Sequence, residues 1–79
     1  MTEEQEAIIQ AIFIQDAPMT AAMLAEELGT YPATIKRRID ALGRGFKYGD
    51  EGSYWKLKKF KIRYGKRGPL AAGYDMVPV

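Results

Sequence analysis

ELGTYPATIKRRIDALGRGF, residues 27–46, is the stretch that decides the fold of this chain. Gly29 permits a left-handed turn, and Pro32 suits the first position of a helix, where its missing amide hydrogen is not needed. Apolar side chains then recur at helical spacing, at Ile35, Ile39 and Leu42. The pattern predicts a turn followed by a helix at residues 32–43, with one face buried and the other open.

The open face of this predicted helix is basic. Arg37 lies near its centre, and Thr34, Lys36 and Arg38 flank it. Arginine pairs bidentately with guanine, so Arg37 is the best candidate for contact with a base, and the major groove is wide enough for one helix. The helix therefore has the form of a DNA-reading element.

The segment LAEELGTYPATIKRRIDAL, residues 24–42, resembles the signature of the winged helix-turn-helix domains of DeoR-type bacterial repressors, L-A-x-x-L-G-V-S-x-x-T-[IV]-x-R-D-[IL]-x-x-L. The likeness continues into a Gly-Phe pair and a wing, and it covers about residues 5–60. It implies an α+β fold with three helices and a two- or three-stranded antiparallel wing. It also implies that Thr34 contacts a phosphate, because the matching threonine of the family lies at the groove edge.

Two residues depart from the family pattern. Most relatives place Ser where this chain has Tyr31, and tyrosine cannot cap a helix in the same way. The Tyr31 phenol could reach a phosphate, or its ring could pack over the turn, and both alternatives stay open. Arg38 stands where the family commonly has Asp, which adds a base and favours contact with the DNA backbone.

Charge is strongly segregated along the chain. Residues 1–35 hold six acids and no Lys or Arg, whereas residues 36–67 hold all twelve bases and three acids. Such segregation predicts one face drawn to a polyanion, most often nucleic acid. The alternative is a basic surface that serves solubility.

After Gly43 the apolar period changes from helical to alternating, which predicts a β-hairpin wing with arms at residues 46–48 and 53–57. Trp55 and Leu57 are expected in the core. The side chains expected to contact phosphates here are those of Arg44, Lys47, Tyr54 and Lys56. Two acids at the tip, Asp50 and Glu51, would be repelled by a minor groove, so we expect the arms to touch DNA.

Residues 56–67 hold seven bases among apolar side chains. Phe60, Ile62 and Tyr64 alternate, which predicts a third strand or an extension of the wing, with a bulge at residues 58–59 that resets the register. Further phosphate contacts are expected from Lys58, Lys59, Lys61 and Arg63. The alternative reading is a basic edge strand that resists aggregation.

The two ends of the chain have different characters. Thr2 opens a capping box before a helix that continues to about residue 15. Its expected apolar stripe consists of Ile8, Ile9, Ile12 and Phe13, and Thr20 is expected to cap a second helix. Residues 1–67 form the expected domain, and residues 68–79 form an apolar tail. The tail could pack across its own domain, join a homodimer or a protein partner, or be disordered.

Composition excludes several classes of function. The chain has 79 residues, no cysteine and no histidine, which argues against disulfides, the usual zinc sites and a histidine-activated nucleophile. We expect no enzyme activity, no cofactor and no metal. No apolar run approaches the length of a membrane span, and the N-terminus is acidic, so we expect a cytoplasmic protein without membrane contact.

The sequence thus predicts a small transcriptional regulator of bacterial or phage type that binds double-stranded DNA. The first alternative is a winged-helix inhibitor or adaptor that engages an acidic protein or a ribonucleoprotein; the acidic wing tip, the missing Ser cap and the apolar tail favour it. An RNA-binding winged helix is the third reading, supported by Tyr48, Tyr54 and Tyr64.

Overall fold

The described residues form three helices and one four-stranded antiparallel sheet, which confirms the α+β prediction. The structure is a computed structural model that describes residues 1–43, 45–49, 52–63 and 70–79. Its elements in chain order are α1 (Glu3–Gln15), β1 (Met19–Thr20), α2 (Ala21–Leu28), α3 (Pro32–Leu42), β2 (Phe46–Tyr48), β3 (Ser53–Arg63) and β4 (Leu70–Pro78). The sheet has four strands where the sequence predicted two or three.

Local capping signals set the ends of α1. The Thr2 hydroxyl accepts a hydrogen bond from the Gln5 amide at 3.2 Å, and the Gln5 side chain accepts one from the Thr2 amide at 2.9 Å, which is the predicted capping box. Asp16, in a left-handed conformation, ends the helix. Ile8, Ile9 and Ile12 are fully buried, but Phe13 is 57% exposed, so its expected place in the buried stripe is wrong.

A cap and a glycine define α2. The Thr20 hydroxyl accepts from the Met23 amide at 3.1 Å, as predicted, and Gly29 ends the helix at φ 68°. The chain then turns directly into α3. The side chains that α2 and α3 bury belong to one core cluster with α1 and the sheet, made by Ile8, Ile12, Met19, Ala21, Leu24, Ala25, Ile35, Ile39 and Tyr74.

Strand β4 is central to the sheet. The strand order is β1-β4-β3-β2, so β4 lies between β1 and β3 and pairs with both. Tyr74 of β4 is buried in the core cluster, and Met76 packs against that cluster. Residues 70–78 of the C-terminal segment therefore pack across their own domain, and they form neither a free arm nor a disordered tail.

Strand β3 runs without the bulge that was predicted at residues 58–59. Its register with β4 is continuous from Trp55 opposite Pro78 to Arg63 opposite Leu70. Leu57 packs against the core cluster, whereas Phe60 and Ile62 lie on the other face of the sheet by strict alternation. The apolar pattern shifts because the buried face of the strand changes along its length, not because the register resets.

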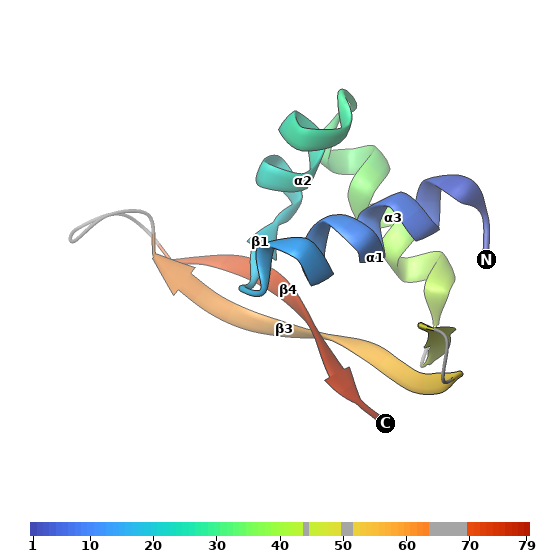
Figure 1. Ribbon diagram of the computed structural model, residues 1–79. Helices are drawn as coiled ribbons and strands as arrows, with labels where there is room; N and C mark the ends of the chain where they lie inside the picture. Colours follow the sequence, from blue (N-terminus) through green and yellow to red (C-terminus); the bar gives the residue numbers. More distant parts are fainter. Residues whose placement is uncertain (44, 50–51, 64–69) are drawn as a thin grey trace.

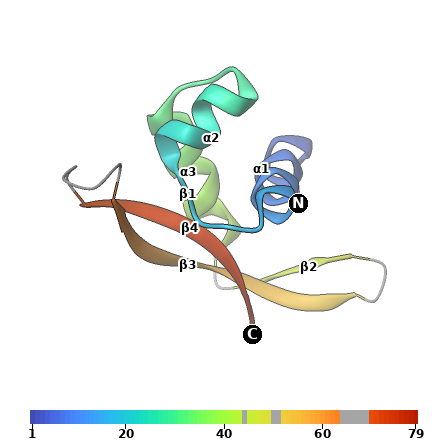
Figure 2. The same cartoon turned by 60° about the vertical axis from the view of Figure 1, so that its left-hand side comes forward.

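The helices cover one face of the sheet and only part of its length. Figures 1 and 2 show α1, α2 and α3 on one side of the twisted β3–β4 hairpin, whose far end extends past the helices. This extension makes the molecule elongated, with principal dimensions of 40 × 24 × 20 Å. The hairpin therefore offers two solvent-facing surfaces where the helices do not cover it.

Candidate nucleic-acid interface

Helix α3 presents the basic face that its periodicity predicted. Ile35 is fully buried and Ile39 is 8% exposed, which fixes the inward side of the helix. Lys36 and Arg37 are exposed, and Thr34 and Arg38 are half-buried at the flank. With 11 residues, α3 is about 16 Å long. Its outward face is thus a short, rigid surface with Arg37 near its centre and Lys36 at one flank.

The N-terminus of α3 lacks a side-chain cap. Tyr31 occupies the N-cap position without accepting a hydrogen bond, as the sequence predicted for tyrosine, and its ring is 76% exposed. Its ring therefore does not pack into the core. The amide groups of the first turn, at Ala33 and Thr34, are left to water or to an anion, and the helix dipole favours an anion there.

The bases of the sheet divide between its two faces. Lys56 and Lys58 point to the face away from the helices, and Lys47 joins them because it pairs with Tyr54. We call Lys47, Lys56 and Lys58 the outer-face bases. The helix-side bases are Lys59, Lys61 and Arg63, which share the face of β3 that carries Leu57. All six side chains are exposed.

Two outer-face bases lie over aromatic rings. The Lys47 ammonium is 5.2 Å from the centre of the Tyr54 ring, and the Lys58 ammonium is 5.5 Å from the centre of the Phe60 ring. Such cation–π contacts at exposed positions contribute about 0.5–1 kcal/mol each. They orient these two lysines along the surface of the sheet.

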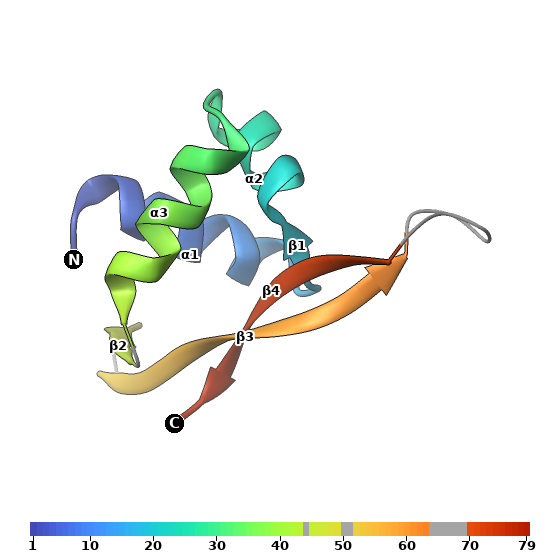
Figure 3. The same cartoon turned by 180° about the vertical axis from the view of Figure 1, so that it is seen from behind.

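The structure therefore does not gather all the predicted DNA-binding residues on one surface. In Figure 3, α3 passes in front of α1, and the far end of the β3–β4 hairpin extends beyond α2 and β1. Helix α3 and the helix-side bases belong to one side of the sheet, whereas Tyr54 and the outer-face bases belong to the other. The bases of the sheet that were predicted to contact phosphates are therefore divided between two opposite faces. Arg44 lies outside the described residues, as do Asp50, Glu51 and Tyr64.

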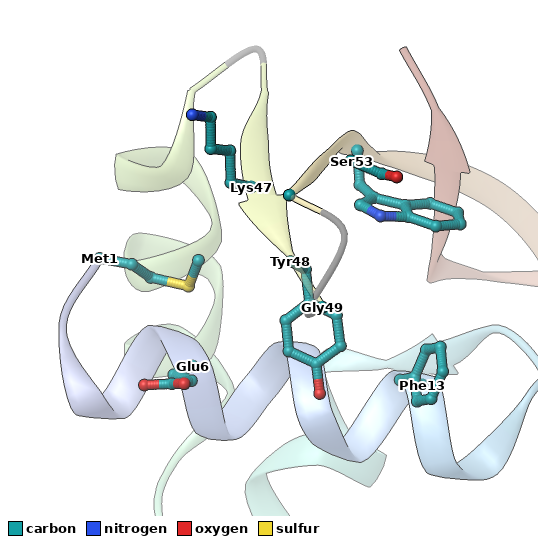
Figure 4. A pocket seen from close by; sticks show the side chains of 9 residues that line it. Met1, Glu6, Phe13, Lys47, Tyr48, Gly49 and Ser53 are labelled. Atoms are coloured by element: carbon teal, nitrogen blue, oxygen red, sulfur yellow. The ribbon is translucent and has the colours of Figure 1, made fainter.

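Sequence reasoning missed a groove between α1 and the β2–β3 hairpin. It has a volume of about 870 Å³, and the residues that line it include Phe13, Tyr48 and Trp55. In Figure 4, Tyr48 projects from β2 toward α1, beside Phe13, and the two rings meet edge to face at 5.5 Å. Trp55 thus lines this groove instead of joining the core cluster as expected. The signal in the sequence was the run of Ile12, Phe13 and Ile14 near the end of α1. Three consecutive apolar residues of a helix cannot all face the same core, so one of them is left for another surface.

The described residues contain no group of three or more acidic side chains placed to hold a metal ion. No helix in residues 1–43, 45–49, 52–63 and 70–79 is both long and apolar enough to cross a membrane. We also compared the chain with models of protein families, with curated proteins and with solved structures, and none of the three comparisons found a match.

Proposed function

We propose that this chain is a winged helix-turn-helix protein that binds double-stranded DNA with α3 in the major groove and acts in transcription control. The observation that carries the proposal is the division of α3 into two faces. Ile35 is buried, Arg37 is exposed on the opposite side, and Lys36 is exposed at the flank. Among the described residues, no carboxylate pairs with either cation. Arg37 is therefore free to pair with a guanine edge.

The arrangement of elements supports the winged-helix part of the proposal. Helix α2 ends at Gly29, α3 begins at Pro32, and an antiparallel hairpin of β2 and β3 follows. Helix α1 packs against both later helices through the common core. The resemblance implies a wing of two or three strands, and this sheet has in addition the strand β4, which lies between β1 and β3.

Phosphate contacts at the N-terminus of α3 and along the hairpin would hold α3 in the groove. The uncapped first turn of α3 offers amide donors to one phosphate, with Thr34 beside them. Lys59, Lys61 and Arg63 lie on the same side of the sheet as α3 and supply positive charge farther along the hairpin. Phosphate contacts carry most of the affinity but no sequence information, so specificity falls to Arg37.

The test is selection of bound sequences from a random duplex pool at about 150 mM salt, where non-specific binding is weak. A specific protein enriches a motif over several rounds. Sedimentation of the free protein and of the complex decides whether one or two copies bind; a dimer predicts half-sites about one helical turn apart. A pool that stays random, together with binding that disappears as salt rises, would overturn sequence-specific recognition by α3.

A further inference from the structure

Strand β3 has one paired edge and one mostly open edge. It pairs with β4 from Trp55 to Arg63, but with β2 only through its first three residues, which end at Trp55. Beyond that point no described residue pairs with β3 on the β2 side. The open edge spans residues 56–63 and is about 25 Å long. Figure 2 shows β2 beside only the first part of β3.

The backbone groups along this edge can be assigned from the ladder. The Val79 amide donates to the Tyr54 carbonyl at 3.2 Å, so even-numbered residues of β3 bond toward β4. In an antiparallel ladder the residues between them direct their N–H and C=O groups the other way. The groups that face the open edge beyond β2 belong to Leu57, Lys59, Lys61 and Arg63.

Side chains next to the open edge define what could pair with it. The helix-side bases Lys59, Lys61 and Arg63 repeat at every second position on one face, and half-buried Phe60 and Ile62 alternate with them on the other. A second copy of β3 would place cations opposite cations, which is unfavourable in cross-strand pairs. A strand with acids at every second position would instead place opposite charges together.

We propose that the open edge of β3, residues 56–63, binds an extended acidic peptide segment of a partner protein as an additional strand. Its acidic residues would face the helix-side bases, and apolar residues between them would cover Phe60 and Ile62. Nucleic acid fits this edge less well, because its phosphates would meet the outward carbonyl groups as well as the amides. This interaction uses the same helix-side bases as the proposed phosphate contacts, so the peptide and DNA would compete for them, but it does not depend on base reading by Arg37.

The first experiment uses a synthetic peptide of alternating Glu and Val and follows amide hydrogen exchange by NMR. Binding as a strand slows exchange at Leu57, Lys59, Lys61 and Arg63 and leaves even-numbered amides, already bonded to β4, unchanged. The control peptide has the same sequence and charge, with N-methyl groups on alternate residues that remove its edge donors. We expect it to bind at least about tenfold more weakly, since several backbone hydrogen bonds are lost. Equal binding of the two peptides would overturn the proposal.

The second experiment separates the backbone from the charge. Lys61→Pro removes an outward amide but none of the bonds to β4, and proline is tolerated at an edge. We expect it to abolish peptide binding, whereas Lys61→Ala, which keeps the amide, weakens binding only a few-fold. An NMR spectrum confirms that each variant is folded. Lys61→Pro and Lys61→Ala with equal affinities would show that only charge matters.

Arg37→Ala keeps the two proposals distinguishable. It should leave peptide affinity unchanged, because α3 makes no contact with the open edge in this proposal. If the peptide fails to bind while a random-sequence duplex binds to β3, the open edge is only an electrostatic surface and the proposal fails. This outcome would not test base reading by α3.

Discussion

The Cδ1 atom of Ile62 lies 3.0 Å from the position that a β-carbon on Gly73 would occupy. The Cβ atom of Pro18, the residue before β1, lies 3.0 Å from the same point, so Pro18 and Ile62 of β3 both approach this face of β4. Ordinary carbon–carbon contacts are longer, about 3.5–4.0 Å. The absence of a side chain at Gly73 is therefore what allows Ile62 to pack on the outer face of the sheet.

Gly73→Ala should lower the free energy of unfolding by about 1–3 kcal/mol, the usual cost of overpacking. The isoleucine side chain can shift, but the proline ring cannot, so the strain is relieved only in part. Chemical denaturation measures the change, and Ala72→Ser at the exposed neighbouring position is the matched control. In an Ile62→Ala background the added penalty should shrink; an undiminished penalty would show that Ile62 does not cause it.

Tyr31→Ser should stabilise the protein by about 0.5–1 kcal/mol, because a serine hydroxyl at the N-cap can accept a hydrogen bond from the first turn of α3. Tyr31 makes no such bond, and its exposed ring contributes little packing. Thermal unfolding is the measurement. Tyr31→Ala supplies the comparison, since it removes the ring without adding a cap. Equal stability of the serine and alanine variants would contradict the assignment of Tyr31 as an uncapped N-cap.

Arg37→Ala should reduce discrimination at one base position by about 1–3 kcal/mol and leave the other positions unchanged. Lys61→Ala is the matched control, because loss of a phosphate contact weakens binding to all duplexes alike and makes the salt dependence shallower. Competition binding with duplexes that differ at single positions measures both effects. The α3 hypothesis is wrong if the two substitutions act identically on every duplex.

Phe13 and Tyr48 should show a favourable coupling of about 0.5–1.5 kcal/mol, as edge-to-face aromatic pairs do. Their rings are 5.5 Å apart at 61° and join α1 to the β2–β3 hairpin. A double-mutant cycle with Phe13→Leu and Tyr48→Leu, followed by urea denaturation, isolates the pair from the loss of each side chain alone. Strict additivity of the two substitutions would mean that the hairpin does not rest on α1 through this contact.

Sequence alone was enough wherever a structure depends on neighbours along the chain. The capping box at Thr2, the cap at Thr20, the stop at Gly29 and the start at Pro32 all form as predicted. Each is a local arrangement within a few residues, so its signal lies in adjacent letters. The exposure of Lys36 and Arg37 on α3 follows in the same way, because one helical period fixes which side chains turn outward.

Only the tertiary structure decided how the strands combine and which faces they bury. The place of β4 between β1 and β3 depends on pairing across long stretches of chain, which no local pattern encodes. The change of buried face between Leu57 and Phe60 depends on the core cluster, against which Leu57 packs, and on Pro18, which approaches Gly73 of β4 on the face that carries Ile62. The basic residues are divided between the two faces of the sheet in a similar way. Alternation along β3 sets which basic side chains share a face, but the packing of the helices decides which face is the helix side.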